Sequence, residues 1–142
     1  MKLREKNLTE LQAFHAMRKF LDIFYYKTRS DDVGSLLGDL QLFPEGGTFD
    51  PAAWEEWQES VANILKTKQS EVKNLSELEA LQAMRKFLQI FYENTSSEDV
   101  SLILKDTQIS PDGKTDPSTW QNWKKCINEV REGKFEPYDS LL

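Results

Sequence analysis

A few residues of this chain are of types that take part in chemistry, and each has a simpler structural explanation. His15 is the only histidine, and no aspartate or glutamate stands at a spacing that would complete an acid–base pair or a metal site with it. Cys126 is the only cysteine, and the matching position of an internal repeat, described below, is Ser60. We therefore expect Cys126 to be a buried structural residue rather than a nucleophile.

The paired acidic residues and the turns also lack a catalytic pattern. Asp31 and Asp32 are adjacent, and neighbouring side chains on a helix point about 100° apart, so the two carboxylates do not converge. They suit the first turn of a helix, where the helix dipole favours negative charge. The turn at residues 111–114 has no glycine-rich context for binding phosphate, and neither loop has the regular oxygen spacing of a calcium site. The sequence predicts no enzyme activity, no metal and no cofactor.

The most informative feature of the chain is an internal repeat. Residues 8–63 and 75–129 align with one single-residue gap near Phe49, and about half of the aligned positions are identical. A repeat of this kind indicates two equivalent structural units. We expect an all-α fold of two tandem pseudo-repeated three-helix lobes packed together. The first lobe comprises residues 1–68, and the second comprises residues 69–142 with the C-terminal tail.

Each copy contains start signals for three helices. In the first copy, Thr9 and Gln12 form a capping box, and Leu8 before them fits a hydrophobic staple. Ser30 is followed by two acidic residues, which suits the cap and first turn of a second helix. A third helix is expected from the Asp-Pro pair at residues 50–51. The second copy repeats all three signals, and both copies keep two tryptophans at a helical spacing that is typical of a core.

Two segments lie outside the repeated helices. The linker at residues 66–73 is charged and has no proline or glycine, so we expect it to continue the helix before it. After Gly133 the tail contains Phe135, Tyr138 and Leu141. These side chains are too apolar to stay in solvent, and we expect the tail to lie across a groove between the lobes.

The chain is acidic, with a formal net charge of −6 and a pI of about 4.9. An acidic surface repels nucleic-acid phosphates and anionic lipids and suits a basic protein partner, although the charge can also serve solubility alone. The N-terminal residues do not resemble a signal peptide, and every apolar stretch is shorter than the ~18 residues of a membrane span. We expect a cytoplasmic protein that binds neither nucleic acid nor membrane.

The two copies differ most on exposed positions. The outer face of the third helix is acidic in the first copy, with Glu55, Glu56 and Glu59. The matching residues of the second copy are Gln121, Asn122 and Lys125. Neutral drift explains this difference, but so does a basic partner bound by one lobe only, or a contact of the two lobes through opposite charges. The first helix diverges as well, at Asp22, Tyr26, Lys27 and Arg29.

Two strings of the first copy, SDDVGSLLGDL at residues 30–40 and DPAAWEEW at residues 50–57, resemble a small bacterial family of acidic proteins. Members of this family resemble the immunity proteins found beside polymorphic toxins, including those of contact-dependent inhibition, type VI and Rhs systems. The likeness covers the first copy and, more loosely, the second, which has Ser101 and Lys105 at the two glycine positions. It implies a cytoplasmic protein that binds and neutralises a toxin domain, and it brings no catalytic residues.

We therefore predict an immunity protein that binds a cognate bacterial toxin domain, such as a nuclease, through its acidic surface. A basic substrate cleft attracts an acidic inhibitor, and electrostatic steering speeds their association. The alternative is a non-catalytic adaptor or regulatory protein that binds a helix or peptide between its lobes. The predicted partner-binding residues are acidic side chains of the first copy with two aromatic anchors: Tyr26, Asp31, Asp32, Asp39, Glu55, Glu56, Trp57 and Glu59.

Overall fold

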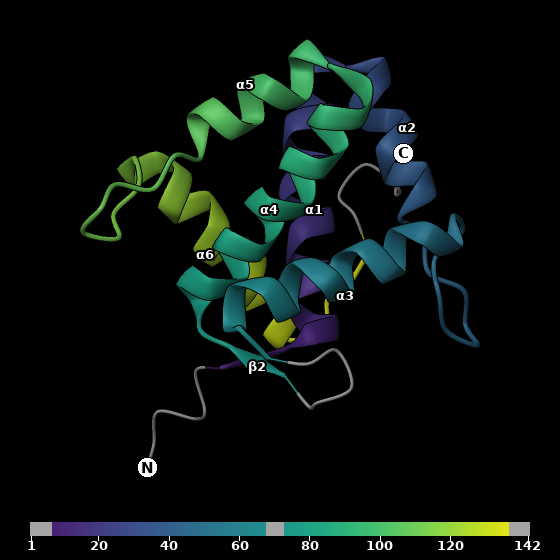
Figure 1. The fold of residues 1–142 in the computed structure, drawn as a ribbon, viewed down its shortest axis with the longest axis horizontal. Helices are drawn as coiled ribbons and strands as arrows, with labels where there is room; N and C mark the ends of the chain where they lie inside the picture. Colours follow the sequence, from purple (N-terminus) through teal and green to yellow (C-terminus); the bar gives the residue numbers. More distant parts are fainter. Residues whose placement is uncertain (1–6, 68–72, 137–142) are drawn as a thin grey trace.

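The computed structural model describes residues 7–67 and 73–136, which are mostly helical (Figure 1). The elements in chain order are β1 (Leu8–Thr9), α1 (Glu10–Thr28), α2 (Asp31–Asp39), α3 (Pro51–Leu65), β2 (Asn74–Leu75), α4 (Glu77–Thr95), α5 (Glu98–Asp106) and α6 (Pro117–Arg131). The prediction of a helical protein is confirmed. Within the described part of the chain, no helix is both long and apolar enough to cross a membrane.

The helices begin where the local signals predict. Thr9 Oγ1 accepts a hydrogen bond from the backbone N–H of Gln12 at 3.0 Å, and Gln12 Oε1 accepts one from Thr9 N–H at 2.9 Å. Ser76 and Glu79 form the same capping box at the start of α4. Serine caps precede α2 and α5, and Asp-Pro pairs begin α3 and α6. These side chains satisfy N–H groups that a helix start otherwise leaves without a partner.

A small antiparallel sheet joins the two copies. It consists of β1 and β2, in which Leu8 pairs with Leu75 and Thr9 pairs with Asn74. Both leucines are fully buried, so the residues that were expected as separate staples pack together. The sequence did not predict this sheet, because two residues are too few to show an alternating pattern.

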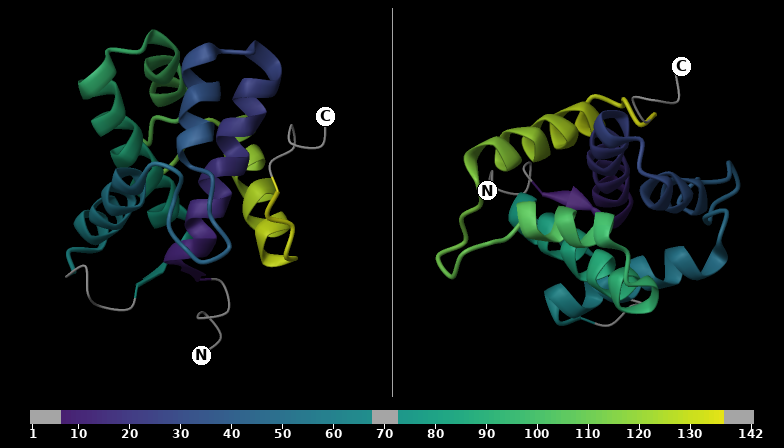
Figure 2. Two further views of the ribbon diagram at one scale, coloured as in Figure 1. Left: turned by 90° about the vertical axis from the view of Figure 1, so that its right-hand side faces the viewer. Right: turned by 90° about the horizontal axis from the view of Figure 1, so that it is seen from above.

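The helices of the two copies pack across one another. The third helix of each copy packs mainly against the first helix of the other copy: α3 lies on α4, and α6 lies on α1 (Figure 2). The short helices α2 and α5 cover α1 and α4 respectively, and they also touch each other. The buried apolar residues form a single cluster. The boundary predicted between residues 68 and 69 lies outside the described residues.

Reciprocal hydrogen bonds tie the starts of α2 and α5 together. Ser30 Oγ donates to Asp99 Oδ2 at 2.6 Å, and Ser97 Oγ donates to Asp32 Oδ2 at 2.6 Å. Each serine oxygen also accepts a hydrogen bond from the first turn of its own helix. The two caps therefore stabilise their helices and join the copies at the same time.

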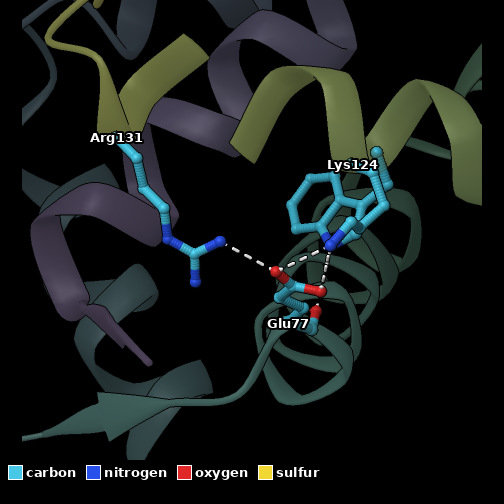
Figure 3. A network of polar contacts seen from close by, with 4 residues as sticks. Glu77, Lys124 and Arg131 are labelled. Atoms are coloured by element: carbon cyan, nitrogen blue, oxygen red, sulfur yellow. Dashed lines mark hydrogen bonds and ion pairs between the residues drawn. The ribbon is translucent and has the colours of Figure 1, made fainter. Parts of the chain in front are cut away.

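A polar network connects the start of α4 to α6. The Glu77 carboxylate accepts hydrogen bonds from Lys124 Nζ at 2.9 and 3.1 Å and from Arg131 Nη1 at 2.8 Å (Figure 3). Burial alone would raise the pKa of Glu77, but the hydrogen bonds and charges of the two cations outweigh burial and lower it. The ionised carboxylate is therefore the form that the fold favours.

The linker and the tail meet their predictions only in part. Helix α3 ends at Leu65, and Lys66 adopts a left-handed conformation with φ of 56°, so the helix does not continue into the linker there. Residues 68–72 lie outside the described residues, as do Tyr138 and Leu141 of the tail. Phe135 of the tail folds back onto α1, where it stacks on His15 with 4.5 Å between ring centroids.

Candidate protein-binding surface

The way α3 begins determines which of its faces is exposed. The Asp50 carboxylate caps the helix by accepting a hydrogen bond from the backbone two residues later at 3.1 Å. A buried stripe that includes Trp57 then faces α4 and the core. The opposite side exposes Glu55 and Glu59, with Glu56 half-buried beside them. We call these three glutamates, together with Asp50, the acidic face.

The carboxylates of the acidic face repel one another. Burial raises the pKa of Glu56, and the nearby charges of Asp50 and Glu59 raise it further. Among the described residues, no lysine or arginine forms an ion pair with Glu55, Glu56 or Glu59. The free protein therefore concentrates negative charge at this face, and a cationic partner would relieve the repulsion.

Two exposed aromatic rings lie directly before the acidic face. The chain from Gln41 to Phe49 forms a narrow loop, in which Phe49 N–H donates to Gln41 C=O at 2.7 Å and Phe43 N–H donates to Gly47 C=O at 3.0 Å. Gly46 and Gly47 have φ values of 106° and 83°, which side chains rarely adopt. The ring centroids of Phe43 and Phe49 lie 6.2 Å apart, and the two residues are 43% and 60% exposed. Adjacent exposed aromatics of this kind are typical of binding surfaces.

The predicted aspartates are divided between the two ends of α2. Asp39 is half-buried and near the acidic face, since its backbone C=O accepts a hydrogen bond from Asp50 N–H at 3.1 Å. Asp31 and Asp32 lie at the other end of the helix, roughly 12 Å away along its axis. Both residues are exposed, and the Asp32 carboxylate accepts the hydrogen bond from Ser97. Asp32 thus already has a partner within the fold.

Of the two predicted aromatic anchors, only one is accessible. Tyr26 is 57% exposed at the end of α1, with the guanidinium of Arg29 5.4 Å from its ring centroid. Trp57 is fully buried, and its choice as an anchor is wrong. Its indole packs edge-on against Phe14 and Phe87, and its Nε1–H donates to the backbone C=O at the start of α1 at 3.1 Å. The side chain is a core residue that joins both copies.

Sequence reasoning missed the aromatic pair, although the repeat contained a signal for it. Phe43 corresponds to Ser110 in the second copy, and Phe49 lies at the alignment gap. An aromatic residue that only one copy keeps, in a loop and not in a helical stripe, is not needed for a shared core. The same comparison of copies identified the three glutamates, so it would also have found the two rings.

The residues considered first for chemistry have structural surroundings. His15 is half-buried, and burial, followed by the charges of Arg18 and Lys19, lowers its pKa to about 4. Cys126 is fully buried in α6, as predicted. In the described ranges, no group of three or more histidine, cysteine, aspartate or glutamate side chains is arranged to hold a metal ion.

Comparisons with protein-family models, with curated proteins and with solved structures find no match for this chain.

Proposed function

We propose that this protein is a non-catalytic binding protein that holds a basic protein partner on its acidic face and the adjacent aromatic pair. The partner we propose is a bacterial toxin domain with a cationic cleft, such as a nuclease, so that the protein acts in the cytoplasm as an immunity protein. The proposal of an immunity protein comes from the resemblance of two sequence strings of the first copy, at residues 30–40 and 50–57.

One observation carries the proposal: three glutamates lie on one helix without an ion-pairing cation among the described residues, beside two exposed phenylalanines. Like charges at this spacing destabilise the free protein slightly. The second copy does not repeat the arrangement, because it has Gln121, Asn122 and Lys125 at the three positions. A feature that is unfavourable for the free fold and confined to one copy is more consistent with binding than with structure.

The two parts of the surface would contribute differently to binding. Carboxylates at the rim speed the encounter with a cationic partner and make its rate sensitive to salt. Aromatic rings that become buried against the partner contribute most of the affinity in typical interfaces. Because Phe43 and Phe49 are already held by the loop, ordering them on binding would cost little conformational entropy.

The proposal includes the tandem pseudo-repeat as its scaffold. Support comes from corresponding contacts in the two copies, such as the pairing of Leu8 with Leu75 and the reciprocal bonds of Ser30 and Ser97. With a duplicated scaffold, one copy can diverge on its surface while the shared core keeps the fold. Tyr26 and Asp31 lie at the other end of α2 and are secondary candidates.

The first test is growth rescue. The chain is co-expressed with the toxin encoded beside it, and survival is compared with that of cells expressing the toxin alone. We expect protection, together with co-purification of the two proteins. Cells that die in the presence of well-expressed chain, with no co-purifying toxin, would refute the assignment as an immunity protein.

The second test addresses the acidic face. Reversing Glu55, Glu56 and Glu59 to lysine should weaken toxin binding about 100-fold or more at low salt, because attraction becomes repulsion. Far-UV circular dichroism should be unchanged, since the three side chains lie outside the core. The control carries the same change in net charge at exposed positions of the second copy: Glu93→Lys, Asp112→Lys and Glu132→Lys. Equal affinities of the two variants at low salt would remove the acidic face as the site.

The third test addresses the aromatic pair. Phe43→Ser places the residue of the second copy in the loop, and we expect about tenfold weaker toxin binding or more. The urea midpoint should not change, because the ring is largely exposed. Leu102→Ser is the control, since Leu102 is 49% exposed on α5. If both serine variants bind the toxin like the parent protein, the loop is not part of the interface.

A second candidate function, that of an adaptor that binds a peptide, is favoured by a separate observation. The chain's own tail contacts α1, with the ring of Phe135 stacked on His15. This contact is an intramolecular example of the peptide binding that the alternative requires. The tail contacts α1 of the first copy, so an external peptide would bind at the corresponding place on α4 of the second copy.

A further inference from the structure

A groove of about 640 Å³ lies where the end of α3 meets α4 and α5. Its lining combines an apolar floor with three cations, and none of its described lining residues is acidic. The residues that matter for the argument are Ile64, Lys66, Arg85, Lys86, Leu104 and Ile109. A cationic groove is unusual in a chain whose net charge is −6.

The repeat relates this groove to a second place in the molecule. Arg85 and Lys86 of α4 correspond to Arg18 and Lys19 of α1, and Gln82 corresponds to His15. Because α6 packs on α1 as α3 packs on α4, the counterpart of the groove lies on α1 beside the end of α6. Figure 2 shows the chain after α6, in yellow, doubling back beside these helices.

The described part of the tail contacts α1 at that place, although Phe135 remains 41% exposed. Phe135 stacks on His15 with an angle of 21° between the rings. Lys19 Nζ donates to the backbone C=O of Glu136 at 3.0 Å and forms an ion pair with Glu129 at 3.2 Å. The Glu136 carboxylate is also close enough to favour the charged form of Arg18, whose pKa burial otherwise lowers.

The matching basic side chains of α1 and α4 differ in burial. Arg18 is only 8% exposed and Lys19 only 3%. Their counterparts differ: Arg85 is half-buried and Lys86 is exposed. Arg85 is nonetheless held in place, because its Nε donates to Thr107 Oγ1 at 3.2 Å and its Nη2 to a backbone C=O of α5 at 3.0 Å. The groove on α4 therefore presents a positioned guanidinium and two lysines to solvent.

We propose that the groove between α3, α4 and α5 binds an extended segment of a partner protein in which an aromatic residue is followed by acidic ones. The aromatic ring would lie on the apolar floor formed by Ile64, Leu104 and Ile109, and carboxylates would face Lys66, Arg85 and Lys86. The tail motif Phe135-Glu136 is the example within this chain. This inference rests on the adaptor function proposed second. It uses other residues than the acidic face, although Glu59 lines a neighbouring pocket together with Lys66 and Lys86.

The probe is a fluorescein-labelled peptide with the tail sequence GKFEPYDSLL, titrated with the intact protein and followed by fluorescence anisotropy. We expect saturable binding, and about tenfold weaker binding when the phenylalanine of the peptide is replaced by serine. Binding should persist in the variant with lysine at positions 55, 56 and 59. Failure of the acidic face and failure of the groove are therefore distinguishable.

Variants of the groove make the test specific. The variants Lys86→Glu and Lys66→Asn should each weaken peptide binding, and the double variant should weaken it by about 100-fold. Asparagine is chosen at position 66 because it tolerates the left-handed backbone conformation found there. Lys27→Glu is the matched control, because Lys27 is an exposed lysine that does not line the groove. Thermal unfolding followed by circular dichroism verifies that each variant folds.

Two results would overturn the proposal. The first is peptide binding that Lys86→Glu and Lys66→Asn leave unchanged, because the peptide would then be bound elsewhere, for example in place of the chain's own tail. The second is a concentration-dependent dimer in sedimentation experiments without peptide that Lys86→Glu abolishes. That dimer would make a second copy of this chain the occupant, in place of a partner protein.

Discussion

Glu77 and its repeat counterpart Glu10 allow the same substitution to be compared in opposite electrostatic surroundings. Glu77 is bound by Lys124 and Arg131, which lower its pKa against the opposing effect of burial. In the first copy the two cation positions are occupied by Gln58 and Leu65. Burial raises the pKa of Glu10, while Lys73 and a hydrogen bond with Gln58 oppose the rise only in part. Glutamine at each position removes the charge and nearly preserves the shape.

The size of the expected effect follows from the exposure of the network. The side chains of Glu77, Lys124 and Arg131 are 16%, 38% and 25% exposed. A buried hydrogen bond to a charged group stabilises a protein by about 1.5–3 kcal/mol, and an exposed ion pair by less than about 1 kcal/mol. We therefore expect Glu77→Gln to lower the free energy of unfolding at pH 7 by about 1–2 kcal/mol. With a urea m-value of about 2 kcal/mol/M, the midpoint should fall by about 0.5–1 M.

The pH dependence of the two variants should have opposite signs. The pKa of Glu77 is lowered in the folded state. Its contribution to the free energy of unfolding is therefore fully present above the unfolded-state pKa of about 4.3, and it is lost as the pH falls through the lower folded-state pKa. The cost of Glu77→Gln should then shrink as the pH falls below that folded-state pKa. The raised pKa of Glu10 means that ionised Glu10 disfavours folding above its folded-state pKa. Glu10→Gln should therefore be neutral or stabilising at pH 7.

Urea unfolding followed by far-UV circular dichroism, at pH 7 and over the acid range in which carboxylates become protonated, measures all of these quantities. Two results would refute the reasoning. One is a loss of stability for Glu10→Gln as large as that for Glu77→Gln at pH 7. The other is a cost of Glu77→Gln that remains unchanged at acid pH, because a contribution from charge pairing must vanish once the carboxylate is protonated.

Two further predictions concern α2 and its junction with α5. Gly38→Ala should stabilise the protein by about 0.4–1 kcal/mol, because no heavy atom beyond the neighbouring backbone of its own helix lies within 4 Å of the added Cβ. Gly34→Ala should stabilise less or destabilise, since its Cβ would lie 2.8 Å from Tyr25 Cε1; equal gains in urea midpoint for both variants would contradict the packing argument. Ser97→Ala removes a helix cap and the hydrogen bond to Asp32. We expect urea unfolding to show a free energy of unfolding lower by about 1–2 kcal/mol. A loss below about 0.3 kcal/mol would show that neither hydrogen bond stabilises the fold.

The helix starts could be predicted because they depend on neighbouring residues. The capping box of Thr9 and Gln12 and the Asp-Pro start at Asp50 involve residues within three positions of one another. Cys126 could be assigned to the core from its repeat counterpart alone. For helix starts, which depend on local hydrogen bonds, the sequence prediction and the structure agree.

The candidate site was predicted only in part, for a geometric reason. Glu55 and Trp57 are two residues apart on one helix, and a rotation of about 200° places them on different sides. The helical spacing of the tryptophans already indicated a buried stripe, so Trp57 should not have been chosen as an anchor. The loop pair of Phe43 and Phe49 was missed because hydrophobic periodicity in helices does not report on loops.

The sequence by itself determined a helical protein, the starts of its helices and the charge that distinguishes the two copies of its internal repeat. These properties follow from local hydrogen bonding, helical periodicity and residue type. Only the tertiary structure decided that α3 packs on α4 and α6 on α1, that Asp32 is bound by Ser97, and that the tail contacts α1. The reason is that residues far apart in the chain make these contacts, and two equivalent copies offer each helix two equivalent partners.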